Sequence, residues 1–291
     1  MYSQIDANKR KSAILIMVFI AIILVLGWLM AEGLGYGYEM LVFAAVFAGL
    51  MSLGGYYAGD RVALASSGAK GPIKKSDNPY VYRIVENLCI ASGLQMLKIY
   101  IINDSAPNAF ACGRDPEHAS IALTTGIIER LENEELEGVI AHELCHIKNY
   151  DIRLMTIIVV LVGIISILVN WFYRISFFGG RDRDNRAGGI LAIIGIVAII
   201  LSPIIAELIK LAISRKREFL ADASGVLLTR YPEGLASALL KISTYTAPMK
   251  NANSGTAHLF IANPFGKKNI SKLFSTHPPI EERVKALRKM A

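Results

Sequence analysis

Cysteine is scarce in this chain of 291 residues. There are three, Cys89, Cys112 and Cys145, and no two of them form a C-x-x-C pair. This pattern excludes a disulfide framework and argues against a cysteine-rich structural zinc site. It favours a reducing, cytosolic location for the soluble part of the chain. Cys145 is interpreted as a packing residue and not as a nucleophile.

The chain also lacks a basic stripe interleaved with aromatic residues, although its formal net charge is +7. This absence argues against nucleic acid as a partner. The basic residues gather beside apolar segments instead, where they would set orientation and meet anionic lipid. Two such clusters are Lys9, Arg10, Lys11 and Arg215, Lys216, Arg217.

Charge is missing from long stretches of the chain, which is 53% hydrophobic and has a mean hydropathy of +0.43. Residues 12–30 and 40–58 carry no charge, and 154–173 and 190–213 are two further apolar runs. Each is long enough to cross a hydrocarbon core of about 30 Å as a helix. The last run contains Pro203, Glu207 and Lys210, which leaves open whether it bends or ends early.

The four runs predict two transmembrane hairpins. Basic residues flank the first hairpin, so the positive-inside rule places both of its ends in the cytoplasm. The loop of the second hairpin is itself rich in arginine, but two crossings return the chain to the side already assigned. The flanking residues are Lys9, Arg10 and Lys11 before the first hairpin and Arg61, Lys70, Lys74 and Lys75 after it.

Two soluble segments remain. The first is predicted to hold a helix over 81–92 and three strands, 98–102, 109–113 and 120–124, in a small, mostly antiparallel sheet. An exposed edge strand in this sheet would hold an extended peptide by its backbone. The second segment is predicted to be mainly helical, with a last helix beginning at Pro278 and Pro279.

The domain organisation follows from these runs. We predict an N-terminal transmembrane hairpin over 1–60 and a first soluble, cytoplasmic part over 61–153. A second hairpin over 154–213 and a second soluble, cytoplasmic part over 214–291 follow. The fold class is therefore membrane α-helical, with four transmembrane helices, joined to a mainly α, α+β domain with a small sheet.

The most informative motif is H-E-x-x-H, formed by His142, Glu143 and His146. Apolar residues recur at helical spacing around it, and Asn133 is positioned to cap the helix. Residues four apart lie on one helical face, so both imidazoles can bind one metal ion, which we predict to be zinc. Glu143 is turned by about 100° from His142 and stays available as a general base.

A catalytic zinc needs a third protein ligand. Glu218 and Asp222, four residues apart, follow the fourth apolar run and share one helical face. Glu218 could bind the metal while Asp222 accepts a hydrogen bond from a ligand histidine. The alternative is an exposed helix in which Arg215 and Arg217 pair with these acids, and the spacing alone does not decide between the two.

With these residues in place, the chain resembles the HtpX family of membrane-embedded zinc metalloproteases, relatives of the CAAX prenyl endoproteases. The resemblance covers nearly the whole chain and includes Pro107-Asn108-Ala109-Phe110, His277-Pro278-Pro279 and Arg283. It implies a zincin-like domain with one zinc ion. The implied ligands are His142, His146 and Glu218, with Glu143 as the base, Asp222 as a support, and Asn108, His277 and Arg283 around the bound peptide.

Several of these residues have plainer interpretations. His277 could stabilise an oxyanion or simply precede a helix, Arg283 could only pair with a carboxylate, and Asn108 could only shape a turn. Asp151 is interpreted as a helix-end or membrane-boundary residue and not as a ligand, His118 is interpreted as a solvated residue, and His258 is assigned no role.

We therefore predict a zinc metalloendopeptidase of the cell membrane, multi-pass, with its site facing the cytoplasm. The resemblance implies polypeptide substrates, among them misfolded membrane proteins, and a role in protein quality control and stress response. Two alternatives stay open: a prenyl-protein processing protease, and a non-catalytic membrane scaffold with a structural zinc. The sequence makes no prediction of oligomeric state.

Overall fold

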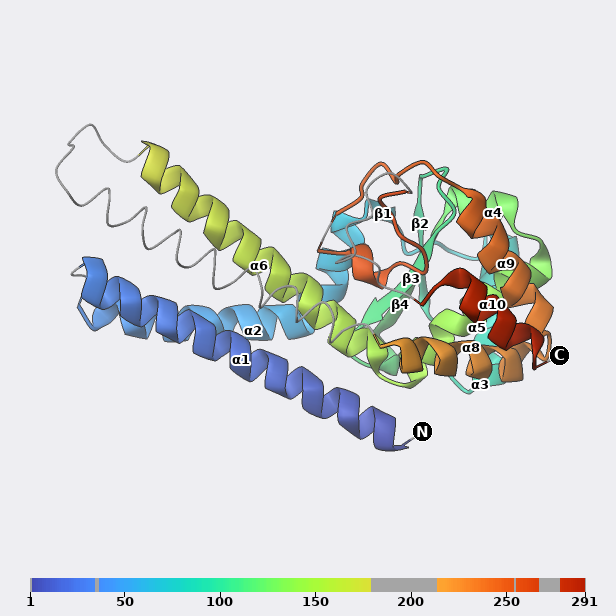
Figure 1. The fold of residues 1–291 in the computed structure, drawn as a ribbon, viewed down its shortest axis with the longest axis horizontal. Coiled ribbons are helices and arrows are strands. Elements are labelled where there is room, and N and C mark those ends of the chain that lie inside the picture. The colour runs from blue at the N-terminus through green and yellow to red at the C-terminus, as the bar shows by residue number, and fades with distance from the viewer. Residues whose placement is uncertain (1, 35–36, 179–213, 254, 267–277, 291) are drawn as a thin grey trace.

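Long helices form one end of the molecule in the computed structural model, which describes residues 2–34, 37–178, 214–253, 255–266 and 278–290. Helices α1 (Tyr2–Leu34) and α2 (Glu39–Ser66) lie side by side and extend away from the part of the molecule that contains the sheet (Figure 1). Among the described residues, these two contain the segments that are long and apolar enough to cross a membrane, Ile5–Trp28 and Glu39–Ser66. The first two predicted runs lie within them.

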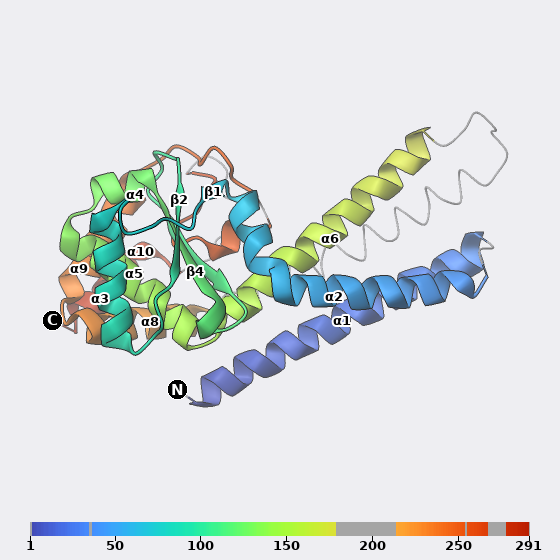
Figure 2. The same ribbon diagram turned by 180° about the vertical axis from the view of Figure 1, so that it is seen from behind.

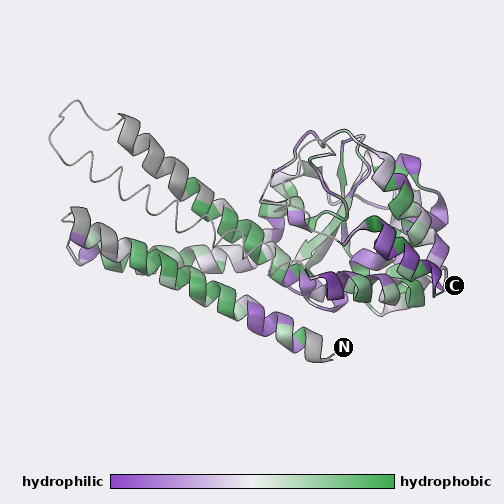
Figure 3. Cartoon of the chain, in the orientation of Figure 1, coloured by the Kyte–Doolittle hydropathy of each residue, from purple (hydrophilic) through white to green (hydrophobic). Residues whose placement is uncertain are grey.

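The surface of these two helices fits lipid better than water. Figure 3 shows their middle portions as apolar bands, and large apolar side chains stay exposed along them. A contiguous exposed apolar face of this size is uncommon in soluble monomers. Examples are Met17, Val42, Phe43, Leu50 and Leu53.

Helix α6 (Asp151–Phe178) contains the third predicted run. It packs closely on α2 because glycine leaves room there: a Cβ atom added at Gly59 would lie 2.8 Å from Cγ2 of Thr156, and one at Gly55 would lie 2.9 Å from Cγ1 of Val160. The fourth predicted run, 190–213, lies outside the described residues.

The sheet has four strands, β1 (Ala69–Lys70), β2 (Lys98–Ile102), β3 (Ala109–Gly113) and β4 (Ala119–Thr124), in the order β1-β2-β4-β3. The outer pairs are antiparallel and the central pair β2–β4 is parallel. The three predicted strands are confirmed, but the sheet is mixed and β1 was missed. A strand of two residues carries no periodic signal, and the order of strands depends on contacts between distant segments.

The sheet separates two apolar cores. Alternate residues of β3 point to opposite faces, so Ala109 and Ala111 pack on the side of the H-E-x-x-H helix, whereas Phe110 and Cys112 pack on the side of α1, α2 and α6. Figure 2 shows α3 (Pro79–Ser92) against the sheet on the side of the H-E-x-x-H helix. The sheet thus lies between helices α1, α2 and α6 on one side and the H-E-x-x-H helix and α3 on the other.

Helix α5 (Asn133–Lys148) is the H-E-x-x-H helix and lies at the centre of the catalytic domain. Its predicted apolar positions are buried. Its N-cap is Glu132 and not Asn133, because the carboxylate of Glu135 accepts a hydrogen bond from the Glu132 backbone N–H at 2.8 Å and closes the first turn.

Four more helices are described. They are α4 (Thr125–Arg130), α8 (Arg215–Thr229), α9 (Pro232–Thr244) and α10 (Ile280–Arg288), with short 3-10 turns η1 (Pro116–His118) and η2 (Ala257–Leu259). Helices α8 and α9 pack on α5, and α10 packs on α8 and α9. Helix α10 begins just after the two prolines at which the last helix was predicted to start.

Candidate metal centre

His142, His146 and Glu218 come together between α5 and α8. Donor atoms of the three side chains all lie within 4.8 Å of one another, and all three residues are buried. The Nε2 atoms of the two histidines are 3.1 Å apart. Oε2 of Glu218 lies 3.7 Å from Nε2 of His142, and Oε1 lies 3.5 Å from Nε2 of His146. Ligands of a tetrahedral zinc ion, about 2.0–2.1 Å from the metal, are separated by about 3.3 Å.

Glycine allows α5 to approach its neighbours this closely. A Cβ atom added at Gly225 on α8 would lie 3.3 Å from the backbone nitrogen of His142. On the other side, one added at Gly138 would lie 2.7 Å from the backbone nitrogen of Leu235 on α9. A side chain at Gly138 would therefore force α9 to shift, and one at Gly225 would crowd the backbone of His142.

Each histidine has a carboxylate behind it. Nδ1 of His142 lies 2.9 Å from Oδ1 of Asp222, and Nδ1 of His146 lies 3.0 Å from Oδ2 of Asp151. A carboxylate accepts and does not donate, so each ring carries its proton on Nδ1 when neutral. Both Nε2 lone pairs then face each other at 3.1 Å, an arrangement that a shared cation stabilises.

The electrostatics of the site also favour a cation. Burial lowers the pKa of His146, but the hydrogen bond with Asp151 and the nearby Glu218 charge outweigh burial and raise it to about 9. The same negative field that holds a proton on this ring attracts a metal ion, which binds in exchange for the proton. The residues present therefore fit a zinc ion.

Asp222 is anchored by an arginine. Arg283 on α10 donates from Nε to Oδ2 of Asp222 at 2.9 Å and from Nη2 to Oδ1 at 2.6 Å. Burial raises the pKa of the Asp222 carboxyl, but the hydrogen bond with His142 and the Arg283 charge lower it to about 2. Both acids, Glu218 and Asp222, are buried and face α5, so the alternative of an exposed ion-pair helix is wrong.

Arg283 lies behind the ligands. Its side chain is fully buried, and Nη1 lies 3.7 Å from Oε2 of Glu218. This position favours the interpretation of Arg283 as an ion-pairing support over contact with a bound peptide. His277, which the resemblance places at the peptide, lies outside the described residues.

Glu143 points toward the sheet. Its Oε2 accepts a hydrogen bond from the backbone N–H of Ala111 on β3 at 3.0 Å, and the residue is 2% exposed. Because Glu143 follows His142 directly, its carboxylate is both next to the metal ligands and fixed to a strand. A carboxylate in this position can take and return a proton.

Asp151 is the site residue that the sequence interpretation missed. It is the first residue of α6, as its interpretation as a helix end requires, yet it also orients His146. Asp151 follows His146 by five residues, which is not a helical spacing. The two residues lie on different helices, α5 and α6, which a turn at Asn149 and Tyr150 separates. The sequence offered one signal for this role of Asp151, the general rule that a metal-binding histidine has a carboxylate as hydrogen-bond partner.

The edge of β3 is covered. Its five residues are buried, and Ala109 accepts a hydrogen bond from the Ile261 N–H at 3.0 Å. The Asn108 side chain donates to the Ala262 carbonyl at 2.9 Å and accepts from the Ala262 N–H at 3.2 Å. The edge of β3 is therefore not exposed at its Ala109 end, because the chain's own segment 260–262 occupies it.

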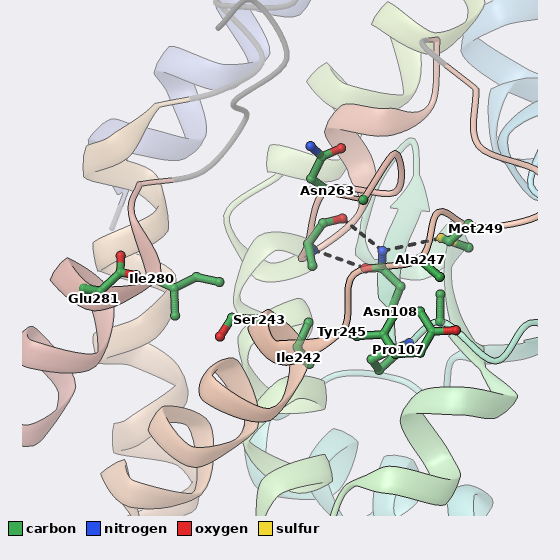
Figure 4. A pocket seen from close by; sticks show the side chains of 13 residues that line it. Pro107, Asn108, Ile242, Ser243, Tyr245, Ala247, Met249, Asn263, Ile280 and Glu281 are labelled. Carbon is green, nitrogen blue, oxygen red and sulfur yellow. Dashed lines mark hydrogen bonds between the residues drawn. The ribbon is translucent and has the colours of Figure 1, made fainter. Parts of the chain in front are cut away.

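A cavity of about 290 Å³ adjoins this contact (Figure 4). Asn108 lies at its wall, with the hydrogen bonds to Ala262 and Met249 drawn as dashed lines. The wall otherwise comes from the end of α9, the loop after it and the start of α10. Labelled examples are Pro107, Tyr245, Asn263 and Ile280.

Three further residues have no place in the site. Cys145 is buried, and burial raises its thiol pKa to about 12, as expected for a packing residue. His118 is exposed and lies beside Asp115. Nε2 of His258 lies 3.0 Å from the carbonyl oxygen of Met155 on α6, so this histidine links η2 to α6.

Comparison with known proteins agrees with this geometry. The profile of peptidase family M48 matches residues 75–291. A protease HtpX homolog of Caldanaerobacter subterraneus subsp. tengcongensis is 44% identical over 288 residues, covering 97% of this chain and 95% of that protein. A protease HtpX homolog of Dictyoglomus thermophilum is 45% identical over 289 residues, covering 99% of this chain and 94% of that protein.

A solved structure is similar in fold. The crystal structure of S. mikatae Ste24p superposes with a TM-score of 0.51 at 19% sequence identity, covering 99% of this chain and 67% of that chain. At this identity the likeness concerns the fold alone. It extends over the helical end of the molecule as well as the catalytic domain.

Proposed function

This chain belongs to peptidase family M48 and is a membrane-bound metalloprotease, and we propose that it hydrolyses peptide bonds in cytoplasmic segments of membrane proteins or of misfolded proteins. The observation that carries the proposal is the buried cluster of His142, His146 and Glu218 with Glu143 beside it. Zinc, one ion per chain, is the metal that this donor set fits.

The roles of the residues follow from their positions. His142, His146 and Glu218 would hold zinc, which acts as a Lewis acid on the peptide carbonyl and makes a water nucleophilic near neutral pH. Glu143 takes the proton of the attacking water on Oε1, because Oε2 is held by the Ala111 N–H, and delivers it to the leaving amine nitrogen.

The supporting carboxylates keep the rings in place. Asp222 and Asp151 accept from the Nδ1–H groups of His142 and His146, which fixes the tautomer in which each Nε2 is free to bind metal. Arg283 holds Asp222 in turn. His277 remains the proposed donor to the oxyanion.

The membrane topology is part of the proposal. We propose four crossings, with the catalytic domain and the N-terminus on the cytoplasmic side of the cell membrane. Supporting this, α1 and α2 are of spanning length, and basic residues lie at the domain end of α1, where Lys9 Nζ sits 4.6 Å from the centre of the Tyr150 ring. An alkaline phosphatase fusion within residues 181–186 should be active, whereas a fusion at Ser66 should not. The reverse pattern would contradict this topology.

The function is tested with detergent-purified, zinc-loaded protein and unfolded casein. Glu143→Gln should lower the cleavage rate by about a hundred- to ten-thousand-fold and retain the zinc. Glu134→Gln, on the exposed start of the same helix, is the matched control and should cleave at the wild-type rate. Removal of zinc by a chelator should abolish cleavage, and added zinc should restore it.

The same assay separates the alternatives. Wild-type protein that binds zinc and cleaves neither casein nor a prenylated peptide would point to a scaffold with a structural zinc. Cleavage of the prenylated peptide alone would point to prenyl-protein processing. A role in quality control predicts that cells lacking the protein accumulate damaged membrane proteins under heat stress.

A further inference from the structure

Asn8, on the first membrane helix α1, is buried against the catalytic domain. It is 2% exposed, although α1 is otherwise one of the more exposed helices. Its side-chain Nδ2 donates to Oδ1 of Asp151 at 2.7 Å and to the Asn149 carbonyl oxygen at 2.9 Å. Both partners lie more than 140 positions further along the chain.

Asp151 joins this amide to the metal centre. Its Oδ1 accepts from Asn8, and its Oδ2 lies 3.0 Å from Nδ1 of His146. One carboxylate thus bridges α1 and a metal-ligand candidate. Because the Asn8 amide fixes Oδ1, it sets the plane of the Asp151 carboxylate. That plane determines the direction from which Oδ2 contacts the imidazole ring of His146.

The amide has a single orientation that satisfies its neighbours. Nη1 of Arg217 lies 3.4 Å from Oδ1 of Asn8 and 3.3 Å from Oδ1 of Asp151. The acceptor end of Asn8 therefore faces a cation, while the donor end faces a carboxylate and a carbonyl. Since Arg217 directly precedes Glu218, the same cluster also contacts the residue next to the third ligand candidate.

We propose that Asn8 is a positioning residue for the metal centre, acting through Asp151 on His146. This rests on the proposed function, because it requires a metal held by His142, His146 and Glu218. It makes α1 more than an anchor. The metal site is complete only while the N-terminal helix is docked on the catalytic domain, so displacement of α1 weakens metal binding.

The test is zinc retention of detergent-solubilised, full-length protein against increasing EDTA. Asn8→Ala should release half of its zinc at about tenfold lower EDTA than wild type, at the lower end of the effect of removing a direct partner of a ligand. Ser12→Ala is the matched control: Ser12 is equally buried one turn along α1, donates only to the Asn8 carbonyl, and does not touch Asp151. It should retain zinc as wild type does.

The absorption spectrum of cobalt-loaded protein distinguishes a positioning role of Asn8 from a purely structural one, because loss of a structural contact alone would leave the spectrum unchanged. The visible absorption bands of cobalt, which report ligand geometry, should shift in Asn8→Ala and stay unchanged in Ser12→Ala. Size-exclusion chromatography selects folded protein for both measurements. If Asn8→Ala yields none, Asn8→Ser, whose hydroxyl ends one bond short of the amide nitrogen, should give the same losses.

A double substitution decides whether Asn8 acts through Asp151. In an Asp151→Asn background, Asn8→Ala should cause no further loss of zinc. Additive losses, or wild-type zinc retention by Asn8→Ala, would overturn the inference. His142→Ala separates failure of the inference about Asn8 from failure of the proposed metal site. If the zinc content of the protein does not depend on His142, the proposed metal site itself fails.

Discussion

Glu143 on α5 accepts a hydrogen bond from the backbone N–H of Ala111 on β3, with Oε2 3.0 Å from the nitrogen. This contact ties the proposed general base to the edge strand of the sheet. Because β3 also packs on the membrane side through Phe110 and Cys112, the base, the strand and the membrane helices form one connected structure.

The ion pair behind the metal centre should carry much of the stability of the domain. Replacing Arg283 by Met removes the cation beside the buried Asp222 carboxylate and leaves it the hydrogen bond from His142, which costs roughly 3–5 kcal/mol. Arg288→Ala is the control, since Arg288 on the same helix makes an equally two-pronged pair with Glu233 on the surface. Thermal unfolding in detergent should show a fall in Tm of about 10 °C for the first variant and no measurable change for the second. An equal fall in Tm for both variants would contradict the stabilising role of the buried Arg283–Asp222 pair.

Two glycines of α2 should respond oppositely to alanine. A Cβ at Gly59 meets Cγ2 of Thr156 at 2.8 Å, so Gly59→Ala should destabilise the α2–α6 contact by about 1–3 kcal/mol. Gly54 has no atom within 4 Å of an added Cβ, so Gly54→Ala should be neutral or stabilising, as helix propensity predicts. The Tm of the two variants in the same detergent checks this. A stabilised Gly59→Ala protein would show that the helices are not in close contact.

Asn108 should hold segment 260–262 on the edge of β3. Asn108→Ala leaves both the N–H and the carbonyl of Ala262 without their side-chain partner, and because these groups are only partly buried the loss is about 1 kcal/mol for each. Limited proteolysis should then cut within residues 257–266 faster than in wild type. Asn263→Ala, which loses only a hydrogen bond within the loop, is the control. The idea fails if both variants are cut at the same rate.

Two cysteines outside the metal motif should be inert in the folded protein. Burial raises the thiol pKa of Cys89 and of Cys112, so the thiolate is a small minority at pH 8 in the native state. A disulfide reagent at pH 8 should react with neither within minutes and should react with both in denaturant, where the pKa returns to about 8.5. Because the thiol pKa values lie above the working pH, the reaction rate of the folded protein should rise by up to about tenfold between pH 8 and pH 9 and still stay far below the rate in denaturant. Rapid native labelling of Cys112 would indicate that β3 opens.

Local spacing was sufficient for the features that depend on neighbouring residues. The period of α5 placed His142 and His146 on one face, and the four-residue interval did the same for Glu218 and Asp222 on α8, because a helix turns by a constant angle per residue. The long uncharged runs likewise predicted α1, α2 and α6, since spanning length depends only on composition and number of residues.

Tertiary structure decided the rest, because the contacts involved join segments far apart in the chain. No spacing rule places β4 between β2 and β3, brings segment 260–262 onto β3, or moves Arg283 behind Asp222. The clearest case is Asp151. The sequence indicated only a helix-end or membrane-boundary residue, whereas the fold presents its two oxygens to His146 on one side and to Asn8, near the N-terminus, on the other.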